Sequence, residues 1–227
     1  MGQVIWVEGI IGSGKSTLTA QLAEKLDMRA IHEPVDSNPY LTDFYEALEF
    51  DVLTKELGRE AQRTQHLAYA MQMYLLHERY ALQQLAVAEA LAGRGALLDR
   101  GLPGDRVFAK MLRSDGSITA RDWEVYERAY EVMTCSLRPP SLIVFLDVDP
   151  RTALDRVKAR ARDCESSMSL DYLTALDRGY RDLLAEIESG RHVWSRGMNV
   201  LKWPWNQDHM KTDDLIREIG LRLELGR

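Results

Sequence analysis

Short, continuous apolar runs alternate along the chain with longer segments in which apolar residues recur at helical spacing. The apolar runs predict strands at residues 4–7, 30–32, 96–98, 141–148 and 200–203. Helical spacing and capping signals predict helices at 15–26, about 59–91, 119–133, 151–160, 170–187 and 213–223. Strands that alternate with helices indicate a parallel sheet with helices on both faces. We therefore expect an α/β fold whose ligands bind beyond the carboxyl ends of the strands.

The composition fits a single domain over residues 1–227 with a buried core, because 45% of the residues are hydrophobic and 28% are charged. The net charge of −6 argues against a nucleic-acid polymer as partner, so any bound polyanion must meet a local basic cluster. No apolar run reaches the ~18 residues of a membrane span, and no targeting segment precedes the first strand. The two cysteines, Cys135 and Cys164, lie far apart in the sequence, which is typical of a reducing compartment. We therefore expect a cytoplasmic protein without a membrane partner.

Residues 9–16 read GIIGSGKS, which matches the phosphate-binding pattern G-x-x-x-x-G-K-[ST] between a strand and a helix. In that pattern the backbone N–H groups of the loop and of the helix N-terminus face the phosphates. Lys15 is expected to reach the β- and γ-phosphates, and the Ser16 hydroxyl to bind Mg²⁺. The expected nucleotide-binding residues are Gly9, Gly12, Ser13, Gly14, Lys15, Ser16 and Thr17. The motif predicts a nucleoside triphosphate such as ATP but leaves the acceptor open, since kinases, regulatory GTPases and motor ATPases share it.

Two further charged sites follow predicted strands, at the edge of the sheet where the loop is expected. Glu33 follows the second strand, where a carboxylate can accept the proton of an attacking hydroxyl; alternatively it is a solvated loop residue. Asp99 and Arg100 follow the third strand, where a carboxylate can bind Mg²⁺ and a guanidinium can neutralise phosphate charge. The alternative for these two residues is a surface ion pair. Both sites are candidates for the acceptor half of a phosphotransferase.

A basic cluster stands out against the acidic balance of the chain. Residues 151–162 hold five basic residues and one acidic residue, and residues 163–167 read as a loop. Arg160 and Arg162 are two positions apart, so on a regular helix they point to nearly opposite sides. Both bind one nucleotide only if the helix ends there or if they bind different phosphates. We therefore predict a mobile lid at about 158–168 that closes over the phosphates, rather than a solvated helix face.

Five motifs in this order resemble those of the deoxynucleoside kinases, the group that includes deoxycytidine, deoxyguanosine and deoxyadenosine kinases. The motifs are GIIGSGKST, EPV, MQ within the long helix, DRG and RARDCE, and the resemblance runs from Val4 to about Leu184. It implies a P-loop kinase fold, with a five-stranded parallel sheet flanked by helices and an arginine-bearing lid. It also implies a homodimer formed by helix packing. The implied reaction is the Mg²⁺-dependent transfer of the γ-phosphoryl group of ATP, or of another nucleoside triphosphate, to the 5′-hydroxyl of a deoxynucleoside.

The resemblance also implies roles for charged residues next to the transferred phosphoryl group. Glu33 resembles the general base that polarises the 5′-hydroxyl, and Arg100 resembles the arginine that stabilises charge in the same region. Arg160 and Arg162 resemble the arginines of the lid. The expected catalytic residues are therefore Glu33, Arg100 and the loop residue Lys15.

On the acceptor side, the resemblance implies polar side chains around the base and the sugar. Gln72 resembles the glutamine that binds the base edge, and Arg79 and Asp105 resemble the arginine and aspartate of members that prefer cytidine and purines. Tyr45 and Glu165 resemble the pair that holds the 3′-hydroxyl. Fixed donors and acceptors suit an amino-bearing or purine base, whereas thymine would need apolar room for its methyl group. From the residues alone, Gln72 and Arg79 could equally lie on a helix surface, and Tyr45 could pack in the core.

The sequence departs from the family pattern at three places. Asp99 stands where many relatives have glutamate, residues 101–104 replace and shorten a serine- and tyrosine-containing stretch, and residues 46–66 read as an insertion beside the acceptor site. The insertion could lengthen a helix, cover the pocket or admit a larger acceptor. We predict a deoxynucleoside kinase that prefers purine deoxynucleosides, with deoxycytidine as a further candidate. The open alternatives are a deoxynucleoside monophosphate kinase and a non-catalytic or regulatory P-loop nucleotide-binding protein.

Overall fold

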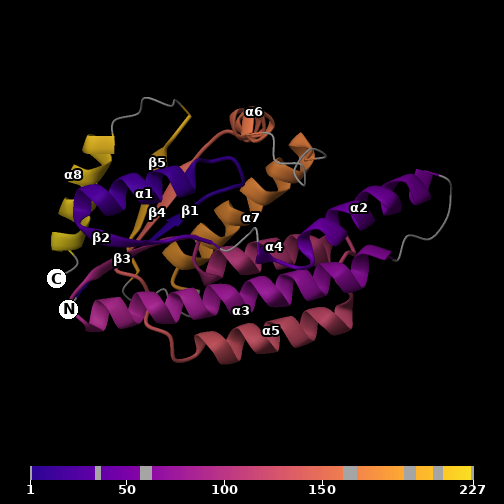
Figure 1. Ribbon diagram of the computed structural model, residues 1–227, viewed down its shortest axis with the longest axis horizontal. Coiled ribbons are helices and arrows are strands. Elements are labelled where there is room, and N and C mark those ends of the chain that lie inside the picture. Colours follow the sequence, from indigo (N-terminus) through magenta and orange to yellow (C-terminus); the bar gives the residue numbers. More distant parts are fainter. Residues whose placement is uncertain are drawn as a thin grey trace.

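Figure 1 shows the computed structural model, which describes residues 2–33, 37–56, 63–160, 168–191, 198–206 and 212–225. Its centre is a five-stranded sheet with the strand order β2-β3-β1-β4-β5. The strands are β1 (Val4–Glu8), β2 (Met28–Ile31), β3 (Gly95–Asp99), β4 (Leu142–Asp147) and β5 (Val200–Pro204). Every neighbouring pair is parallel, which confirms the expected sheet and the α/β class.

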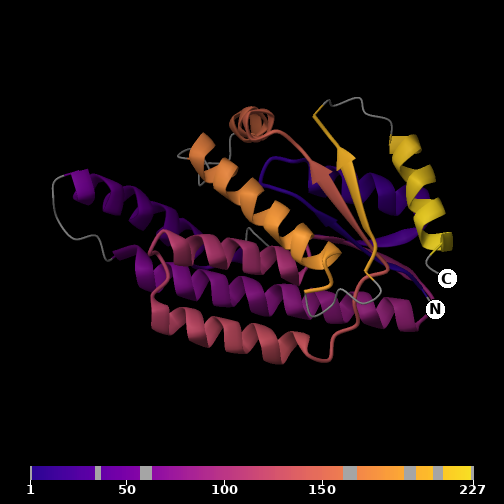
Figure 2. The same cartoon turned by 180° about the vertical axis from the view of Figure 1, so that it is seen from behind.

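Helices cover both faces of this sheet (Figure 1; seen from behind in Figure 2). They are α1 (Lys15–Leu26), α2 (Leu41–Glu56), α3 (Arg63–Leu91), α4 (Leu102–Ser114), α5 (Ala120–Thr134), α6 (Pro150–Arg160), α7 (Leu170–Glu188) and α8 (Thr212–Leu225). Helices α1 and α8 lie on one face, and α3 crosses the other with α4 and α7 beside it. Helix α5 packs on the outer side of α3, and α2 packs against α3 and extends away from the sheet. Among the described residues, no helix combines the length and apolarity that a membrane span requires.

The central strands are apolar along almost their whole length because helices cover both of their faces. All of β1 is buried, including the indole of Trp6, and β4 is buried from Leu142 to Leu146. The indole N–H of Trp6 donates to Oε1 of Gln83 in α3 at 2.8 Å, which satisfies a buried polar group between sheet and helix. This packing fixes the carboxyl ends of the strands around the loop that joins β1 to α1.

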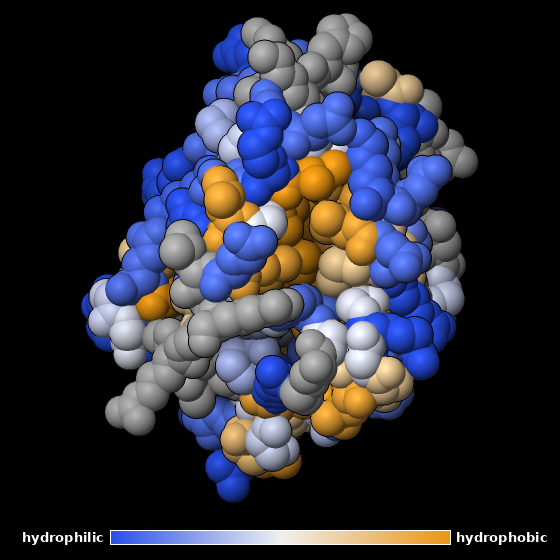
Figure 3. Space-filling model, turned by 90° about the vertical axis from the view of Figure 1, so that its left-hand side faces the viewer, coloured by the Kyte–Doolittle hydropathy of each residue, from blue (hydrophilic) through white to orange (hydrophobic). Residues whose placement is uncertain are grey.

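The amino ends of the strands form the opposite end of the molecule. Figure 3 views the side that carries α8 and the two chain termini, and it shows hydrophobic residues gathered in a hollow with hydrophilic residues around it. The loop between β1 and α1 lies at the other end of the strands. The charged residues singled out in the sequence are therefore remote from this hollow.

Two helices depart from the expectation drawn from the sequence. Helix α4 is not among the helices predicted from the sequence, and it begins with Leu102, Pro103 and Gly104; proline is tolerated there because the first turn of a helix leaves its N–H groups unpaired. Helix α2 occupies a stretch where apolar spacing alone does not indicate a helix. Helix α3 begins at Arg63 rather than at about residue 59, and residues 57–62 lie outside the described residues. Of the expected insertion, residues 46–56 belong to α2 and residues 63–66 to α3.

Candidate active site

One cavity at the carboxyl ends of the strands brings most of the expected site residues together. It encloses about 320 Å³ and lies between the β1–α1 loop, the ends of β2 and β3, and helices α2, α3 and α4. The expected residues that line it are Gly12, Lys15, Ser16, Glu33, Tyr45, Gln72, Arg79, Asp99, Arg100 and Arg160. The other expected loop residues, Gly9, Ser13, Gly14 and Thr17, lie in the same loop and the first turn of α1. Arg162, Glu165 and the expected lid beyond residue 160 lie outside the described residues.

The loop between β1 and α1 has the backbone conformation that its motif requires. Gly12 has a φ of +80°, and a Cβ at this position would lie 2.3 Å from the carbonyl oxygen of Ala153, so the position requires glycine. Gly14, with a φ of +89°, is the N-cap of α1. The unpaired N–H groups of the first turn of α1 are therefore available for an anion at this end of the helix.

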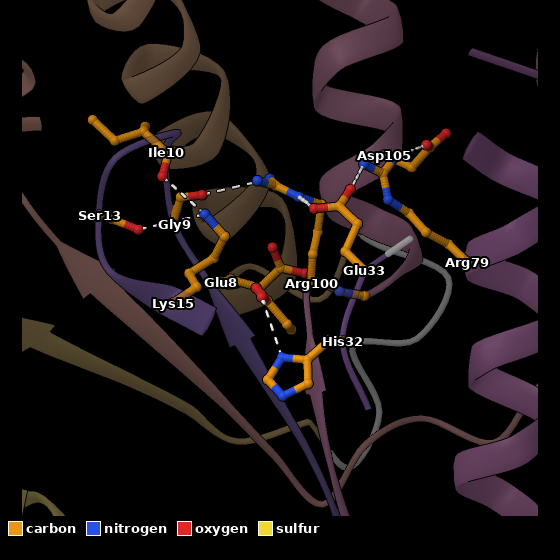
Figure 4. A network of polar contacts seen from close by, with 12 residues as sticks. Glu8, Gly9, Ile10, Ser13, Lys15, His32, Glu33, Arg79, Arg100 and Asp105 are labelled. Atoms are coloured by element: carbon orange, nitrogen blue, oxygen red, sulfur yellow. Dashed lines mark hydrogen bonds and ion pairs between the residues drawn. The ribbon is translucent and has the colours of Figure 1, made fainter. Parts of the chain in front are cut away.

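Lys15 is the cation of this loop, and its side chain is buried. Its Nζ donates to the carbonyl oxygen of Ile10 at 2.9 Å and to Oγ of Ser13 at 3.5 Å (Figure 4). Burial, together with the nearby Arg100 guanidinium, lowers the pKa of Lys15 to about 7, although nearby carboxylates, Asp99 foremost, act in the opposite direction. An anion bound at the loop would therefore restore the full positive charge of Lys15.

Glu33 lies between two arginines in this cavity, as Figure 4 shows. Its Oε1 accepts a hydrogen bond from Nη2 of Arg79, and its Oε2 accepts one from Nε of Arg100 at 3.3 Å. Nη1 of Arg79 also donates to Oδ1 of Asp105, so Arg79 bridges two carboxylates. Burial alone would raise the pKa of Glu33, but Arg79 and Arg100 together lower it to about 2. Glu33 is therefore ionised at neutral pH and held in one orientation from two sides.

Within the part of the chain that the structure describes, one buried donor and one buried acceptor next to this network have no hydrogen-bond partner. Gln72 in α3 is fully buried, and its Nε2 donates to the backbone carbonyl oxygen of Asp105 at 3.1 Å. Because a carbonyl oxygen can only accept, this bond determines which end of the amide faces Asp105. Among the described residues, neither Oε1 of Gln72 nor Nε of Arg79 has a hydrogen-bond partner. A bound ligand with one donor and one acceptor would satisfy both atoms.

Aromatic side chains from α2 and α7 complete the wall of the cavity. Tyr45 of α2 is half-buried, and Tyr172 of α7 lines the same cavity. Burial, with Tyr45 close by, raises the pKa of Tyr172 well above its usual value, so its hydroxyl stays protonated at neutral pH. A protonated hydroxyl both donates and accepts, which suits a sugar hydroxyl.

Asp99 has the properties of a ligand for a hard cation. Its side chain is buried, and its Oδ1 has no hydrogen-bond partner among the described residues, while Oδ2 lies 3.9 Å from Nδ1 of His32. Ser16 lines the same cavity. The described residues contain no group of three or more His, Cys, Asp or Glu side chains that could enclose a metal. One carboxylate and one hydroxyl fit Mg²⁺, which usually keeps several waters and takes its other ligands from phosphates.

Several residues at the site are missed by sequence reasoning. Glu8 does carry a signal, because a carboxylate at the end of an apolar strand is unusual. Tyr172, Tyr126 and Tyr180 carry none, because aromatic residues on amphipathic helices are usually part of the core. Tyr126 nevertheless donates from its hydroxyl to Oδ2 of Asp105 at 2.5 Å, and so fixes the carboxylate that holds Arg79.

Comparison with known proteins identifies the family of this chain. The family model described as "Deoxynucleoside kinase" matches residues 5–219. Deoxyadenosine kinase of Dictyostelium discoideum is 35% identical over 206 residues, which cover 91% of this chain and 74% of that protein. Deoxyadenosine/deoxycytidine kinase of Bacillus subtilis (strain 168) is 31% identical over 185 residues, which cover 80% of this chain and 76% of that protein.

The fold is shared with a solved structure of deoxyadenosine kinase from M. mycoides with bound dATP. The TM-score is 0.75 at 23% identity, over 96% of this chain and 99% of that chain. The family match covers nearly the whole sequence, and the five-stranded parallel sheet is the one that the resemblance implies. The chain therefore belongs to the deoxynucleoside kinase family, whose members phosphorylate deoxynucleosides.

Proposed function

We propose that this enzyme transfers the γ-phosphoryl group of ATP, or of another nucleoside triphosphate, to the 5′-hydroxyl of a purine deoxynucleoside. The observation that carries the proposal is the position of Glu33, which shares one cavity with the phosphate-binding loop and is held between two arginines. The similar proteins named deoxyadenosine kinase and deoxyguanosine kinase support a purine acceptor. We also place the enzyme in the cytoplasm, in line with two cysteines set far apart in the sequence.

The phosphate side of the proposed reaction depends on charge that is already in place. The N-terminus of α1, Lys15 and Arg100 face the part of the cavity where the phosphates would lie, with Arg160 at the end of α6 also lining it. Ser16 and Asp99 would hold Mg²⁺, which when bound neutralises charge on the phosphate oxygens. Phosphoryl transfer needs positioning and charge neutralisation more than covalent chemistry, so these groups supply most of what the reaction requires.

On the acceptor side, Glu33 would accept a hydrogen bond from the 5′-hydroxyl and later its proton. A carboxylate with a pKa of about 2 is a weak base, so it cannot remove this proton before the phosphoryl group begins to move. A loose transition state does not require early removal of the proton. The 5′-hydroxyl becomes acidic only as its oxygen bonds to phosphorus, and Glu33 can accept the proton at that stage. The main work of Glu33 is thus to aim the hydroxyl, and the two arginines keep Glu33 itself oriented.

The unpartnered groups of Gln72 and Arg79 favour an adenine-like edge. Oε1 of Gln72 requires a donor, and Nε of Arg79 requires an acceptor. Adenine presents an amino donor next to the N7 acceptor, whereas thymine presents an oxygen acceptor and a methyl group. Guanine presents two acceptors on the corresponding edge, so we rank deoxyadenosine above deoxyguanosine. Cytosine has an amino donor, which keeps deoxycytidine as a further acceptor.

An acceptor panel tests the proposed function. The purified chain is assayed with ATP and Mg²⁺ against deoxyadenosine, deoxyguanosine, deoxycytidine, thymidine and dAMP, and we expect deoxyadenosine to give the highest kcat/KM. Thymidine as the best acceptor would overturn the base assignment. A preference for dAMP over deoxyadenosine would indicate a monophosphate kinase, and ATP hydrolysis that ignores every acceptor would indicate a regulatory P-loop protein.

We further propose a homodimer built on the outer face of α5. Val125 and Val132 are 50% and 56% exposed, and Ala129 and Met133 line the same surface. These residues recur at helical spacing, so they form one apolar stripe. A stripe of this kind suits a second copy of the chain, because a two-fold axis brings the same surface of both copies together.

A further inference from the structure

Arg100 has a backbone conformation that non-glycine residues rarely adopt. Its φ is +76°, in the left-handed region, and such a conformation persists only where the surroundings hold it. Its guanidinium is buried and lies 4.6 Å over the ring of Phe108. Besides Glu33, this guanidinium contacts the carbonyl oxygen of Gly9 at 3.5 Å and the hydroxyl of Tyr180. The backbone and the side chain of Arg100 are therefore both constrained.

Glu8 and Tyr180 hold Arg100 through groups other than its Nε, which donates to Glu33. The Tyr180 hydroxyl accepts from Nη1 of Arg100 and donates to Oε2 of Glu8 at 3.1 Å. The other oxygen of Glu8, Oε1, accepts from the backbone N–H of Gly101 at 2.7 Å. Glu8 thus binds the backbone directly after Arg100 and, through Tyr180, the guanidinium itself. Figure 4 shows Glu8 and Glu33 near Arg100.

Helix α4 leaves room for this cluster at one position. A Cβ on Gly104 would lie 2.6 Å from Oε2 of Glu8, 2.8 Å from the Tyr180 hydroxyl and 3.0 Å from Cγ of Arg100. Any larger residue would displace one member of the cluster. The first turn of α4 therefore contacts the cluster closely only because residue 104 is glycine.

We propose that Tyr180 and Glu8 are positioning residues for Arg100, which keep its guanidinium directed at Glu33 and at the phosphates. The proposal rests on the proposed function, in which Arg100 stabilises charge during phosphoryl transfer. The Tyr180 hydroxyl also lies between the guanidinium and the carboxyl group of Glu8, since it forms a hydrogen bond to each. Without that hydroxyl, Arg100 is free to pair directly with Glu8 and to withdraw from Glu33.

The first experiment removes the hydroxyl and keeps the ring. Tyr180→Phe should lower kcat about 10- to 100-fold, the effect of one hydrogen bond to a charged group, while KM for ATP and for deoxyadenosine changes less than about threefold. Tyr130→Phe is the matched control, because Tyr130 is also a buried tyrosine and its hydroxyl has no partner among the described residues. Its kcat should equal that of the wild type.

A double-mutant cycle shows whether Tyr180 acts through Arg100. In an Arg100→Lys background, Tyr180→Phe should have little further effect on kcat, since the two residues act as one unit. Gly104→Ala should reduce kcat in the same way as Tyr180→Phe, and it serves as a second variant if Tyr180→Phe fails to fold. Normal kcat in Tyr180→Phe, or additive effects in the cycle, would overturn the positioning role. If instead the wild type phosphorylates no deoxynucleoside, the proposed function fails.

Discussion

Replacement of Glu33 by glutamine tests the central feature of the site. The side chain keeps its size but loses its charge, and it is only 10% exposed, so solvent cannot replace the lost interactions. Arg79 and Arg100, net of burial, lower the pKa of Glu33 from 4.5 to about 2. At ~1.36 kcal/mol for each pKa unit, this shift means that the fold favours the ionised form by about 3 kcal/mol.

The same shift determines how stability depends on pH. Because the pKa is lowered in the folded state, the stabilisation from Glu33 is fully present above about pH 4.5 and is lost as the pH falls toward 2. At pH 7, Glu33→Gln should therefore lower the free energy of unfolding by up to about 3 kcal/mol. For a chain of this size that corresponds to a fall in Tm of about 6–12 °C. The difference from the wild type should narrow below pH 4.5.

The assay combines turnover with unfolding. Glu33→Gln should reduce kcat with deoxyadenosine by about 10²–10⁴-fold if Glu33 orients the hydroxyl and takes its proton. Urea unfolding at pH 7, 4 and 3 measures the stability difference. Glu24→Gln, at an exposed position of α1, is the control and should change neither quantity. Near-normal turnover would remove Glu33 from the proposed role, and unchanged stability at pH 7 would refute the coupling to the two arginines.

The remaining predictions concern the phosphates, the base, the metal and the dimer. Because the pKa of Lys15 is about 7 in the free protein, ATP binding at pH 8 should be accompanied by the uptake of a proton and should weaken as the pH rises. Calorimetry in two buffers measures this proton uptake, and its absence would contradict the prediction. Gln72→Leu removes a buried acceptor and should lower kcat/KM for deoxyadenosine about 10- to 100-fold. The comparison is kcat/KM for thymidine, which should fall by a smaller factor. Asp99→Asn should raise about tenfold or more the Mg²⁺ concentration at which the enzyme reaches half of its maximal rate. A calorimetric measurement of ATP binding is the control. Val132→Glu should convert a dimer to a monomer in analytical ultracentrifugation, whereas Glu24→Gln should not.

Features that depend only on neighbouring residues follow directly from the amino-acid sequence. The loop at residues 9–16 is readable because its glycines, Lys15 and Ser16 must follow one another on a single turn. The continuous apolar runs predict buried parallel strands, since a strand covered on both faces has no polar side. The residues after these strands were expected near the loop because parallel strands bring their carboxyl ends to one edge.

Helix boundaries depended on the environment of each segment. Helix α4 starts on Leu102, Pro103 and Gly104, and only the close approach to Glu8 and Tyr180 explains the glycine. The sequence pattern predicts no helix over 102–114, because local propensity is a weak guide that tertiary packing overrides. The lid residues Arg162 and Glu165 lie outside the described residues, so their roles rest on the motif alone.

The pairings of charged and polar side chains inside the cavity depend on contacts between distant parts of the chain. Arg79 and Asp105 come from different helices, and the sequence singles out both without showing that Arg79 also binds Glu33. Glu8 and Tyr180 stand 172 positions apart and yet share a hydrogen bond. Such contacts depend on where whole helices pack against the sheet. Local spacing cannot encode that arrangement, because it is set by burial across the entire chain.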